Sequence, residues 1–325
     1  MEKFFEVNHL STYFNTSDGI VKAVDDISFS LDSGKTLAIV GESGCGKSVT
    51  ALSITQLLSY PGYIASGEIL LNGVDLVKLN KKQMRQIRGK QVSMVFQEPM
   101  TSLNPVLTVG EQISEIFRTH FQCGREEAKK RATEMIEMVG IPRAEAVYKN
   151  YPHQLSGGMR QRIMIAIALS CDPSLLIADE PTTALDVTIQ AQILDLMNRL
   201  IRKRGKSMIF ITHDLGVVAE IADEVLVMYA GKIVEYAHVK ELFQNPRHPY
   251  TACLLASLPD MKQKKEELYS IPGMVPNLLE MPSGCAFCPR CPMADSQCEM
   301  NSPEFQEVSD QHLVRCLKAN ERMVL

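Results

Sequence analysis

The sequence has 325 residues, of which 45% are hydrophobic, and it carries a formal net charge of −4 at pH 7. This length is enough for one large domain or two smaller ones with a sizeable core, and the charge argues against a protein that binds nucleic acid. No apolar run approaches the ~18 residues of a membrane span and the N-terminus lacks a signal-peptide pattern, so we expect a soluble protein that reaches a membrane only through a partner.

The first part of the chain reads as strands, turns and one helix. Residues 1–35 have strand character, with alternating hydrophobicity in Ala23–Leu31. The apolar run Thr36–Val40 predicts a buried strand, and a helix is predicted to begin at Ser48. Residues 64–97 combine short strand patterns with a basic, helix-like stretch between them.

The middle of the chain alternates helices with further strands. Residues 106–150 are predicted to be helical, with a capping-box pattern at Thr108–Glu111 and a second helix over Glu126–Val139. Two apolar strands are predicted at Leu175–Ala178 and Met208–Thr212. Strands separated by helices indicate an α/β fold with a mainly parallel sheet that has helices on both faces.

The segment Gly41–Ser48 fits the phosphate-binding loop pattern G-x-x-x-x-G-K-[ST]. It stands between a predicted strand and a predicted helix, where glycines allow backbone N–H groups to surround a phosphate and the helix N-terminus adds positive charge. Lys47 can reach the outer phosphates, and Ser48 can ligate Mg²⁺. A glycine turn that binds nothing would be the alternative for this segment alone.

The predicted strand at Leu175–Ala178 runs into an acidic pair, Asp179 and Glu180. Beside a phosphate loop, the first carboxylate can hold Mg²⁺ and the second can orient and deprotonate an attacking water. Two other strands also end in polar residues, Gln97 and His213. Because these strand ends line the ligand crevice of an open α/β sheet, Gln97 can reach the metal and the water, and His213 can reach the γ-phosphate.

A second anion-binding site is predicted where another helix begins. Ser156 reads as the helix N-cap, and Gly157 and Gly158 leave the N–H groups of the first turn bare. A single nucleotide needs only one such phosphate-binding site. A head-to-tail pair of such domains would use both, with each ATP held between the two.

Nine cysteines are present, and five of them lie close to the C-terminus. Without a secretion signal, this cluster favours a metal over disulfides. The spacing C-x₂-C-x₂-C-x₆-C-x₁₇-C suits an iron–sulfur cluster or zinc, and plain thiols are the third possibility. The cluster comprises Cys285, Cys288, Cys291, Cys298 and Cys316; the others, expected to be buried, are Cys45, Cys123, Cys171 and Cys253.

Taken in order, these motifs resemble those of the ABC-type ATPases. The resemblance covers residues 1–240 and implies a P-loop ATPase with a RecA-like parallel sheet core, an N-terminal antiparallel β part and a helical subdomain at about 98–160. It also implies a dimer that encloses two ATP molecules. The motifs that carry it are the phosphate loop at 41–48, Gln97, the LSGG signature at 155–158, Asp179 and Glu180, the run 184–186, and His213.

The resemblance also assigns roles to individual residues. It makes Glu180 the general base and His213 the sensor of the γ-phosphate, with Gln97 as the third catalytic residue. It places Mg²⁺ at Ser48, Gln97 and Asp179, and an adenine-stacking ring at Phe14, with Tyr13 as the alternative. The full set of expected ATP contacts is Phe14, Gly41, Ser43, Gly44, Cys45, Gly46, Lys47, Ser48, Val49, Ser156, Gly157, Gly158 and Asp186.

The last part of the chain resembles one branch of this family, the dipeptide, oligopeptide and nickel importer ATPases. The matching segments are Pro246–Thr251, Ile271–Pro276, Gly284–Cys285 and Pro289–Pro292, while Ser48–Ser53 looks like the D-type subunit. We therefore divide the chain into an ATPase domain at 1–244 and a C-terminal extension at 245–325. In that branch the cysteines matching Cys285, Cys291, Cys298 and Cys316 hold a [4Fe–4S] cluster. Cys288 departs from the pattern of the branch, where that position is often not cysteine. Zn²⁺ is the alternative to the cluster.

The sequence thus predicts an ATP-hydrolysing subunit of an ABC importer of dipeptides or oligopeptides. The implied partners are a second ATPase subunit, which is a paralogue in a heterodimer, two integral membrane permeases and, indirectly, an extracytoplasmic peptide-binding protein. The implied location is the cytoplasmic face of the cell membrane. The alternatives are a non-transport ABC ATPase and an importer of nickel or another small solute; a stand-alone kinase would leave the LSGG helix unexplained.

Overall fold

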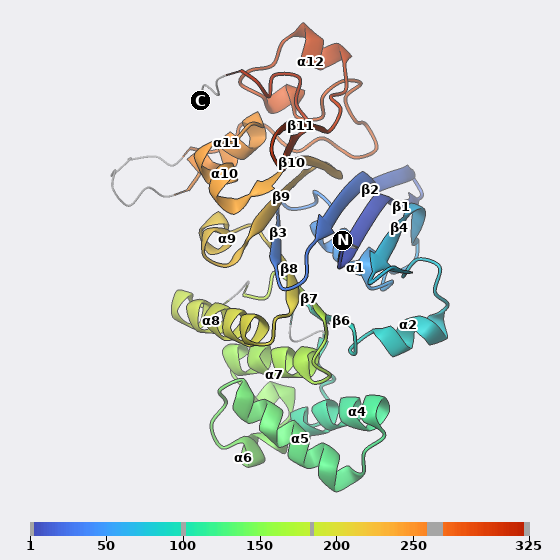
Figure 1. Cartoon of the computed structure of the whole chain (residues 1–325), viewed down its shortest axis with the longest axis vertical. Helices are drawn as coiled ribbons and strands as arrows, with labels where there is room; N and C mark the ends of the chain where they lie inside the picture. The colour runs from blue at the N-terminus through green and yellow to red at the C-terminus, as the bar shows by residue number, and fades with distance from the viewer. Residues whose placement is uncertain (1–2, 99–101, 183–184, 259–268, 322–325) are drawn as a thin grey trace. The chain divides into compact units, whose positions relative to one another are not determined.

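The computed structural model describes residues 3–98, 102–182, 185–258 and 269–321 (Figure 1). The chain forms two compact units. The first unit comprises Met1–Leu31, Thr36–Val77 and Thr212–Leu325, and the second comprises Asp32–Lys35 and Lys78–Ile211. Among the helices of the described ranges, none is both long enough and apolar enough to cross a membrane.

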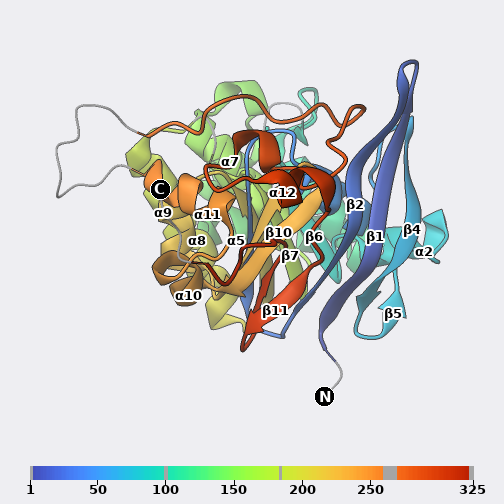
Figure 2. The same ribbon diagram turned by 90° about the horizontal axis from the view of Figure 1, so that it is seen from above.

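The first unit contains an antiparallel sheet with strands in the order β2 (Gly19–Leu31), β1 (Phe5–Thr16), β4 (Gly62–Leu71) and β5 (Val74–Asp75). Figure 2 shows β1 between β2 and β4. The strand predicted from the alternation at 23–31 is the second half of β2. Ile27, Phe29 and Leu31 are buried on one face because successive side chains of a strand point to opposite faces.

The other strands of the first unit follow the order β11 (Gln306–Ser309), β12 (His312–Val314), β10 (Lys232–His238), β9 (Glu224–Tyr229) and β3 (Thr36–Val40). β3 and β9 are parallel, and the remaining pairs are antiparallel. The predicted strand at 36–40 is confirmed, and every residue of β3 is buried. β11 and β12 were not predicted, because they are short and only partly apolar.

The helices of the first unit pack around these strands. Tyr229, Tyr250 and Phe287 are fully buried in one aromatic cluster, with ring centroids 4.7–5.3 Å apart. Because these rings come from β9, from a helix and from a C-terminal loop, the cluster attaches the C-terminal region to the sheet. The helices are α1 (Lys47–Ile54), α9 (Leu215–Ile221), α10 (Val239–Gln244), α11 (Pro249–Ala256), the 3₁₀ helix η2 (Cys288–Arg290) and α12 (Ser296–Met300).

Glu235 of β10 attaches the end of the chain by hydrogen bonds. Its buried carboxylate pairs with His312 Nε2 at 2.7 Å and accepts the backbone N–H groups of Arg247 and His248 at 2.6 and 3.1 Å. A buried carboxylate is retained only when such partners compensate its lost hydration. This single side chain therefore holds β12 and the start of α11 onto β10.

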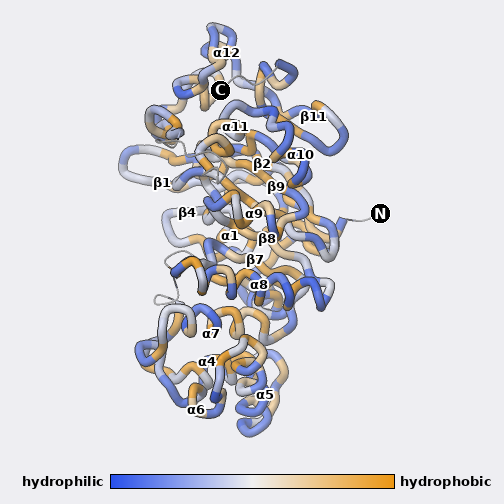
Figure 3. Tube along the Cα trace, turned by 90° about the vertical axis from the view of Figure 1, so that its left-hand side faces the viewer, coloured by the Kyte–Doolittle hydropathy of each residue, from blue (hydrophilic) through white to orange (hydrophobic). Residues whose placement is uncertain are grey.

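The second unit contains the parallel strands β8 (Ser207–Thr212), β7 (Leu175–Asp179) and β6 (Val92–Val95), in that order. β7 and β8 were predicted to within one residue, and β6 lies in the stretch 64–97 that was predicted to contain short strands. Figure 3 shows hydrophobic residues, in orange, along β7, β8 and β9. Such continuous apolar runs are typical of parallel strands, which are buried on both faces.

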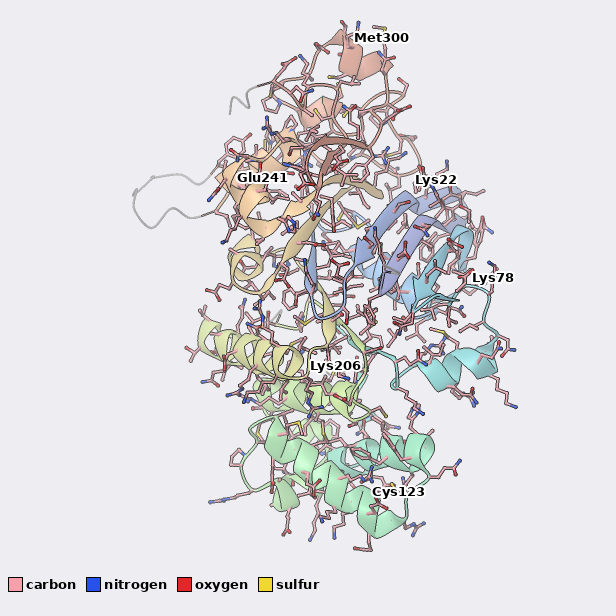
Figure 4. All side chains as sticks on the ribbon, in the orientation of Figure 1. Lys22, Lys78, Cys123, Lys206, Glu241 and Met300 are labelled. Carbon is pink, nitrogen blue, oxygen red and sulfur yellow. The ribbon has the colours of Figure 1, made fainter. Side chains whose placement is uncertain are left out.

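The helices of the second unit confirm the predicted helical region. α4, α5 and α6 pack against one another and appear in green in Figure 1. Cys123 lies in the connection between α4 and α5, and Lys206 lies directly before β8 (Figure 4). The helices are α2 (Lys81–Ile87), α4 (Val109–Phe121), α5 (Arg125–Met138), α6 (Ala144–Tyr148), the 3₁₀ helix η1 (Pro152–Gln154), α7 (Gly157–Leu169) and α8 (Val187–Lys203).

Two local predictions need correction. Thr108 is the N-cap of α4 and accepts the N–H of Glu111 at 3.3 Å, but the carboxylate of Glu111 pairs with Arg118 and does not return to Thr108. The predicted capping box is therefore only half formed, since a cation about two turns away competes for the carboxylate. Among the scattered cysteines, Cys45, Cys171 and Cys253 are buried as expected, whereas Cys123 is half-buried.

Candidate functional site

The predicted phosphate loop connects β3 to α1 in the first unit, as expected. Gly41 and Gly46 have φ values of 151° and 107°, which L side chains rarely adopt. A Cβ atom at Gly41 would lie 2.3 Å from the carbonyl oxygen of Met228, and one at Gly46 would lie 2.5 Å from that of Ala23. Both glycines are therefore required by the backbone packing of the loop, whatever it binds.

Lys47 is buried, with 5% of its surface exposed, and its ammonium group lies inside the loop. Nζ donates hydrogen bonds of 2.8 and 3.0 Å to the carbonyl oxygens of Gly41 and Glu42. Gly44 has φ 78° and is exposed, and no protein atom lies within 4 Å of the position of its Cβ. The loop thus combines one buried cation, Lys47, with free space beside Gly44, and an anion-binding loop requires both.

The remaining loop residues divide between the interior and the surface. Ser43 is exposed, Ser48 and Val49 are half-buried in the first turn of α1, and Cys45 is fully buried. Burial raises the pKa of the Cys45 thiol, so this side chain stays neutral. Its carbonyl oxygen accepts the N–H of Gly231 at 3.0 Å, which attaches the loop to the turn between β9 and β10.

Phe14 and Tyr13 occupy opposite faces of β1. Thr12 shares a face with Phe14, and its hydroxyl lies 2.8 Å from that of Ser53 in α1. Phe14 is therefore on the side of the phosphate-loop helix. Tyr13 has a different set of neighbours, because its hydroxyl donates to Asp25 at 3.0 Å and the ammonium of Lys22 lies 5.6 Å from its ring.

His213 follows β8, belongs to the first unit and is exposed. The next residue, Asp214, is the N-cap of α9 and accepts the N–H groups of Gly216 and Val217. The short link between strand and helix holds the backbone at His213, while its imidazole stays accessible. This position agrees with the sequence prediction that a histidine follows this strand.

Asp179 and Glu180 lie in the second unit, at the end of β7. Asp179 is 4% exposed, and Glu180 has φ 44°, in the left-handed region that non-glycine residues rarely adopt. The N–H of Glu180 donates to Ile211 of β8 at 2.9 Å, and Gln97 Nε2 donates to its Oε2 at 3.0 Å. The strained backbone at Glu180 was not predictable from sequence, and such strain clusters at functional sites.

The predicted second anion site is the N-terminus of α7. Ser156 is its N-cap and accepts the N–H of Met159 at 3.3 Å, so that part of the prediction is confirmed. Ser156 is exposed, and Gly157 and Gly158 are half-buried. A Cβ at Gly158 would lie 2.8 Å from Ile189, whereas one at Gly157 would make an ordinary contact of 3.6 Å with Leu185.

Asp186 has a structural role in the second unit. It is the N-cap of α8, and its carboxylate accepts the N–H of Ile189 at 3.0 Å. Leu185 is half-buried before it. The preceding member of the predicted run, Ala184, lies outside the described residues.

The structure does not support the predicted metal-bound C-terminal extension. Among the residues that it describes, no group of three or more His, Cys, Asp or Glu side chains is arranged to hold a metal ion. Burial raises the pKa of Cys291 to about 11 and of Cys316 to about 12, and the thiols of Cys285 and Cys298 raise both further. The four predicted ligands are therefore electrostatic neighbours, but the raised pKa values of Cys285, Cys291 and Cys316 favour the protonated thiol, which binds metal poorly.

The predicted ATP-site residues are divided between the two units. The first unit holds the phosphate loop, Phe14 and His213, and the second holds Gln97, Asp179, Glu180, Ser156–Gly158 and Asp186. Within the second unit, Gln97 and Glu180 are in direct contact. That these residues bind ATP, with Ser156–Gly158 contacting the ATP of a partner subunit, stays a prediction.

Three described families match the sequence, and two of them are named for transporters. Residues 24–183 match the ABC transporter family, and residues 234–298 match the oligopeptide/dipeptide transporter C-terminal region. The chain is 52% identical to the oligopeptide transport ATP-binding protein AppD of Bacillus subtilis, covering 99% of this chain and 98% of AppD. It is 54% identical to OppD of the same organism, covering 96% of this chain and 88% of OppD. It is 51% identical to the dipeptide transport protein DppD of that organism, covering 99% of this chain and 96% of DppD.

Solved structures give a consistent result for about three quarters of the chain. The dimeric ATP-binding cassette MJ0796, in a post-hydrolysis state bound to ADP and phosphate, superimposes with a TM-score of 0.66 at 26% identity. The match covers 72% of this chain and 98% of that one. A component of the ABC transporter complex cbiONQ, cbiO1 of Clostridium perfringens, gives a TM-score of 0.63 at 28% identity, covering 75% of this chain and 92% of cbiO1.

Proposed function

This chain belongs to the family of ABC transporter ATP-binding proteins, and we propose that it binds and hydrolyses ATP to power a peptide importer. The observation that carries the proposal is the phosphate loop, in which Lys47 is buried against carbonyl oxygens of the loop and Gly44 is left open. The relatives named for oligopeptide and dipeptide transport match this chain over almost its whole length. Both the ATPase activity and the import of peptides follow from this family membership.

The residues of this chain take separate parts in hydrolysis. Lys47 and the loop N–H groups hold the outer phosphates of MgATP, with Ser48, Gln97 and Asp179 facing the magnesium ion of the substrate. Glu180 accepts a proton from the attacking water, which Gln97 helps to orient through its hydrogen bond to the same carboxylate. His213 contacts the γ-phosphate, and an aromatic ring at Phe14 stacks on the adenine.

The partner of this chain is a second ATPase subunit. Ser156 and the two glycines after it present the N-terminus of α7, which is accessible and is a second anion site. In a head-to-tail dimer this terminus faces the ATP held by the other subunit. The solved cassette MJ0796 is described as a dimer, which supports the arrangement. We propose a paralogue as the second subunit, and two permeases that hold the pair at the cytoplasmic face of the membrane.

The transported solute is a dipeptide or an oligopeptide. The relatives that support this class are named for one or the other, and the C-terminal match carries both names. The choice between the two lies in other subunits, because this chain handles only the nucleotide. A nickel importer and a non-transport ATPase are the alternatives, and the relatives named above for peptide transport favour neither.

We also propose a [4Fe–4S] cluster at Cys285, Cys291, Cys298 and Cys316. It rests on the spacing of the cysteines and on their being electrostatic neighbours. Their side chains would have to lose protons and move closer to bind iron. If bound, the cluster would supply folding free energy to the C-terminal region, and no step of hydrolysis depends on it.

The proposal is tested by reconstituting the chain with its permeases and second ATPase subunit in vesicles. Peptide uptake should require ATP, and ATP turnover should rise when a peptide-loaded binding protein is added. A purified complex that hydrolyses ATP but moves no peptide would contradict the import function. Absence of nucleotide binding by the intact chain would contradict the ATPase assignment itself.

A further inference from the structure

Arg290 of the C-terminal region forms an ion pair with Glu42 of the phosphate loop. Nη1 lies 2.6 Å from Oε2 and Nη2 lies 2.9 Å from Oε1, so both N–H groups of the guanidinium face both carboxylate oxygens. The Arg290 side chain is 3% exposed and that of Glu42 is 28% exposed. Two-point pairs of this kind are the strong class of charged hydrogen bond, and burial reduces their screening.

The guanidinium is itself held in place from several directions. Nε donates to the carbonyl oxygen of Pro272 at 3.0 Å, and Nη1 also lies 3.4 Å from the Tyr229 hydroxyl. The guanidinium carbon lies 5.8 Å from the Tyr229 ring centroid and 6.0 Å from that of Phe287. Arg290 is therefore fixed by the aromatic cluster of the first unit and cannot follow Glu42 freely.

The backbone of Glu42 is held by the same region. Its N–H donates a hydrogen bond of 2.8 Å to the hydroxyl of Tyr250 in α11. Its carbonyl oxygen accepts from Lys47. Two residues of the C-terminal region, Tyr250 and Arg290, thus fix the position of the second residue of the phosphate loop.

The charge of Glu42 makes this contact functionally significant. The loop is built to attract an anion, through its N–H groups and Lys47, yet Glu42 places a carboxylate directly after Gly41. An unpaired carboxylate there would repel the phosphates of a nucleotide, since like charges in a partly buried site are poorly screened. Arg290 neutralises that carboxylate.

We propose that Arg290 is a positioning residue for nucleotide binding, which neutralises Glu42 and so makes the C-terminal region part of the functional phosphate loop. The inference rests on the proposed ATP-binding function and extends it to residues outside the ATPase motifs. Deletion or unfolding of the C-terminal region would then weaken ATP binding although that region touches no nucleotide.

The test is the dissociation constant of ATP for the full-length chain, measured by displacement of a fluorescent ATP analogue. Arg290→Met keeps the length of the side chain and removes its charge, and it should weaken ATP binding about tenfold, since an unpaired Glu42 then faces the phosphates. The double variant Glu42→Gln/Arg290→Met should bind ATP within about threefold of the wild type, because the repelling charge is gone. In the reconstituted complex, Arg290→Met should raise KM for ATP and change kcat much less.

Arg315→Met is the matched control. Arg315 also belongs to the C-terminal region, donates to the carbonyl oxygens of Ile233 and Pro303, and lies 5.5 Å from the Phe305 ring. Its removal should lower stability without changing the affinity for ATP. Equal loss of affinity in Arg315→Met and Arg290→Met would show that general loosening of the region, and not the charge of Glu42, is responsible.

Other outcomes would also overturn the inference. A folded Arg290→Met variant that binds ATP with the affinity of the wild type would contradict the inference. A double variant that binds ATP no more tightly than Arg290→Met would also contradict it. If Arg290→Met does not fold, Glu42→Gln alone tests the inference. Glu42→Gln removes the repelling charge, so the inference requires that it bind ATP at least as tightly as the wild type. If the wild type itself does not bind ATP, the proposed function is wrong. If the wild type and the variants bind ATP equally well, only the proposed role of Arg290 is wrong.

Discussion

Gln97 Nε2 donates a hydrogen bond of 3.0 Å to Oε2 of Glu180, whose backbone is held in a left-handed conformation with φ 44°. The hydrogen bond holds the Glu180 carboxylate against the amide of Gln97. The two residues lie 83 positions apart in sequence, and we propose that they act together in one proton transfer.

Glu180→Gln should abolish most hydrolysis and preserve ATP binding. The amide keeps the size of the side chain but cannot accept a proton, so kcat should fall by the 10²–10⁴-fold (order of magnitude) that general-base loss typically causes. The variant should accumulate as an ATP-bound dimer with its partner subunit, which size-exclusion chromatography would detect. Turnover at the wild-type rate would exclude Glu180 as the base.

Lys47→Ala should prevent ATP binding. The substitution removes the buried ammonium that lies against the carbonyl oxygens of Gly41 and Glu42, and with it the main charge opposite the outer phosphates. Losing a buried charged partner weakens binding at least about thirtyfold. Calorimetric titration with ATP would measure the change, and the thermal transition of the variant serves as the folding control.

Gly157→Ala and Gly158→Ala should separate function from packing. A Cβ at position 157 finds an ordinary contact, so the thermal transition should stay within a few degrees, whereas one at 158 forces Ile189 to move and should destabilise the fold by about 1–3 kcal/mol. If the N-terminus of α7 approaches a partner's ATP, Gly157→Ala should still reduce turnover in the assembled complex. Full activity of Gly157→Ala would argue against a close backbone approach to nucleotide.

His248 should make the stability of the protein depend on pH. Burial lowers its pKa from 6.5 to about 3, and Nδ1 accepts the N–H of Tyr250 at 3.0 Å, which requires the neutral ring. The unfolded chain binds a proton below pH 6.5 and the folded chain does not, so stability falls as the pH drops from 6.5 toward 3, by about 2 kcal/mol at pH 5.

His248→Asn is the comparison for that measurement. Asparagine can cap α11 in the same way but does not titrate, so the difference in unfolding free energy between wild type and variant should shrink as the pH falls from 7 to 5. Urea unfolding at several pH values would measure it. A difference that is independent of pH would show that His248 is not buried in the neutral form.

The metal proposal predicts about four irons per chain after anaerobic purification, a count typical of one [4Fe–4S] cluster. Cys291→Ser should then remove the brown colour and loosen residues 280–320, while Cys288→Ser should retain it. ATP turnover should be less affected than the order of the C-terminal region. One zinc per chain and no iron would reject the cluster and leave the importer assignment unchanged.

The local features of the site were predictable because neighbouring residues determine them. The glycines and Lys47 of the phosphate loop, the N-cap at Ser156 and the carboxylate at the end of β7 all depend on spacings of a few residues. A pattern of this kind specifies backbone conformation and the direction of N–H groups wherever the segment lies. The parallel strands were likewise predicted, because continuous apolar runs report burial on both faces.

Only the tertiary structure decided which distant residues complete these features. The pairing of Arg290 with Glu42 joins positions 248 apart, and Glu235 joins β10 to His312 across 77 positions. Neither contact has a local signal, because an arginine or a glutamate has the same sequence pattern whether it faces solvent or a buried partner. Such pairs depend on which surfaces the packed aromatic cluster and the paired strands bring together, and that is a property of the whole chain.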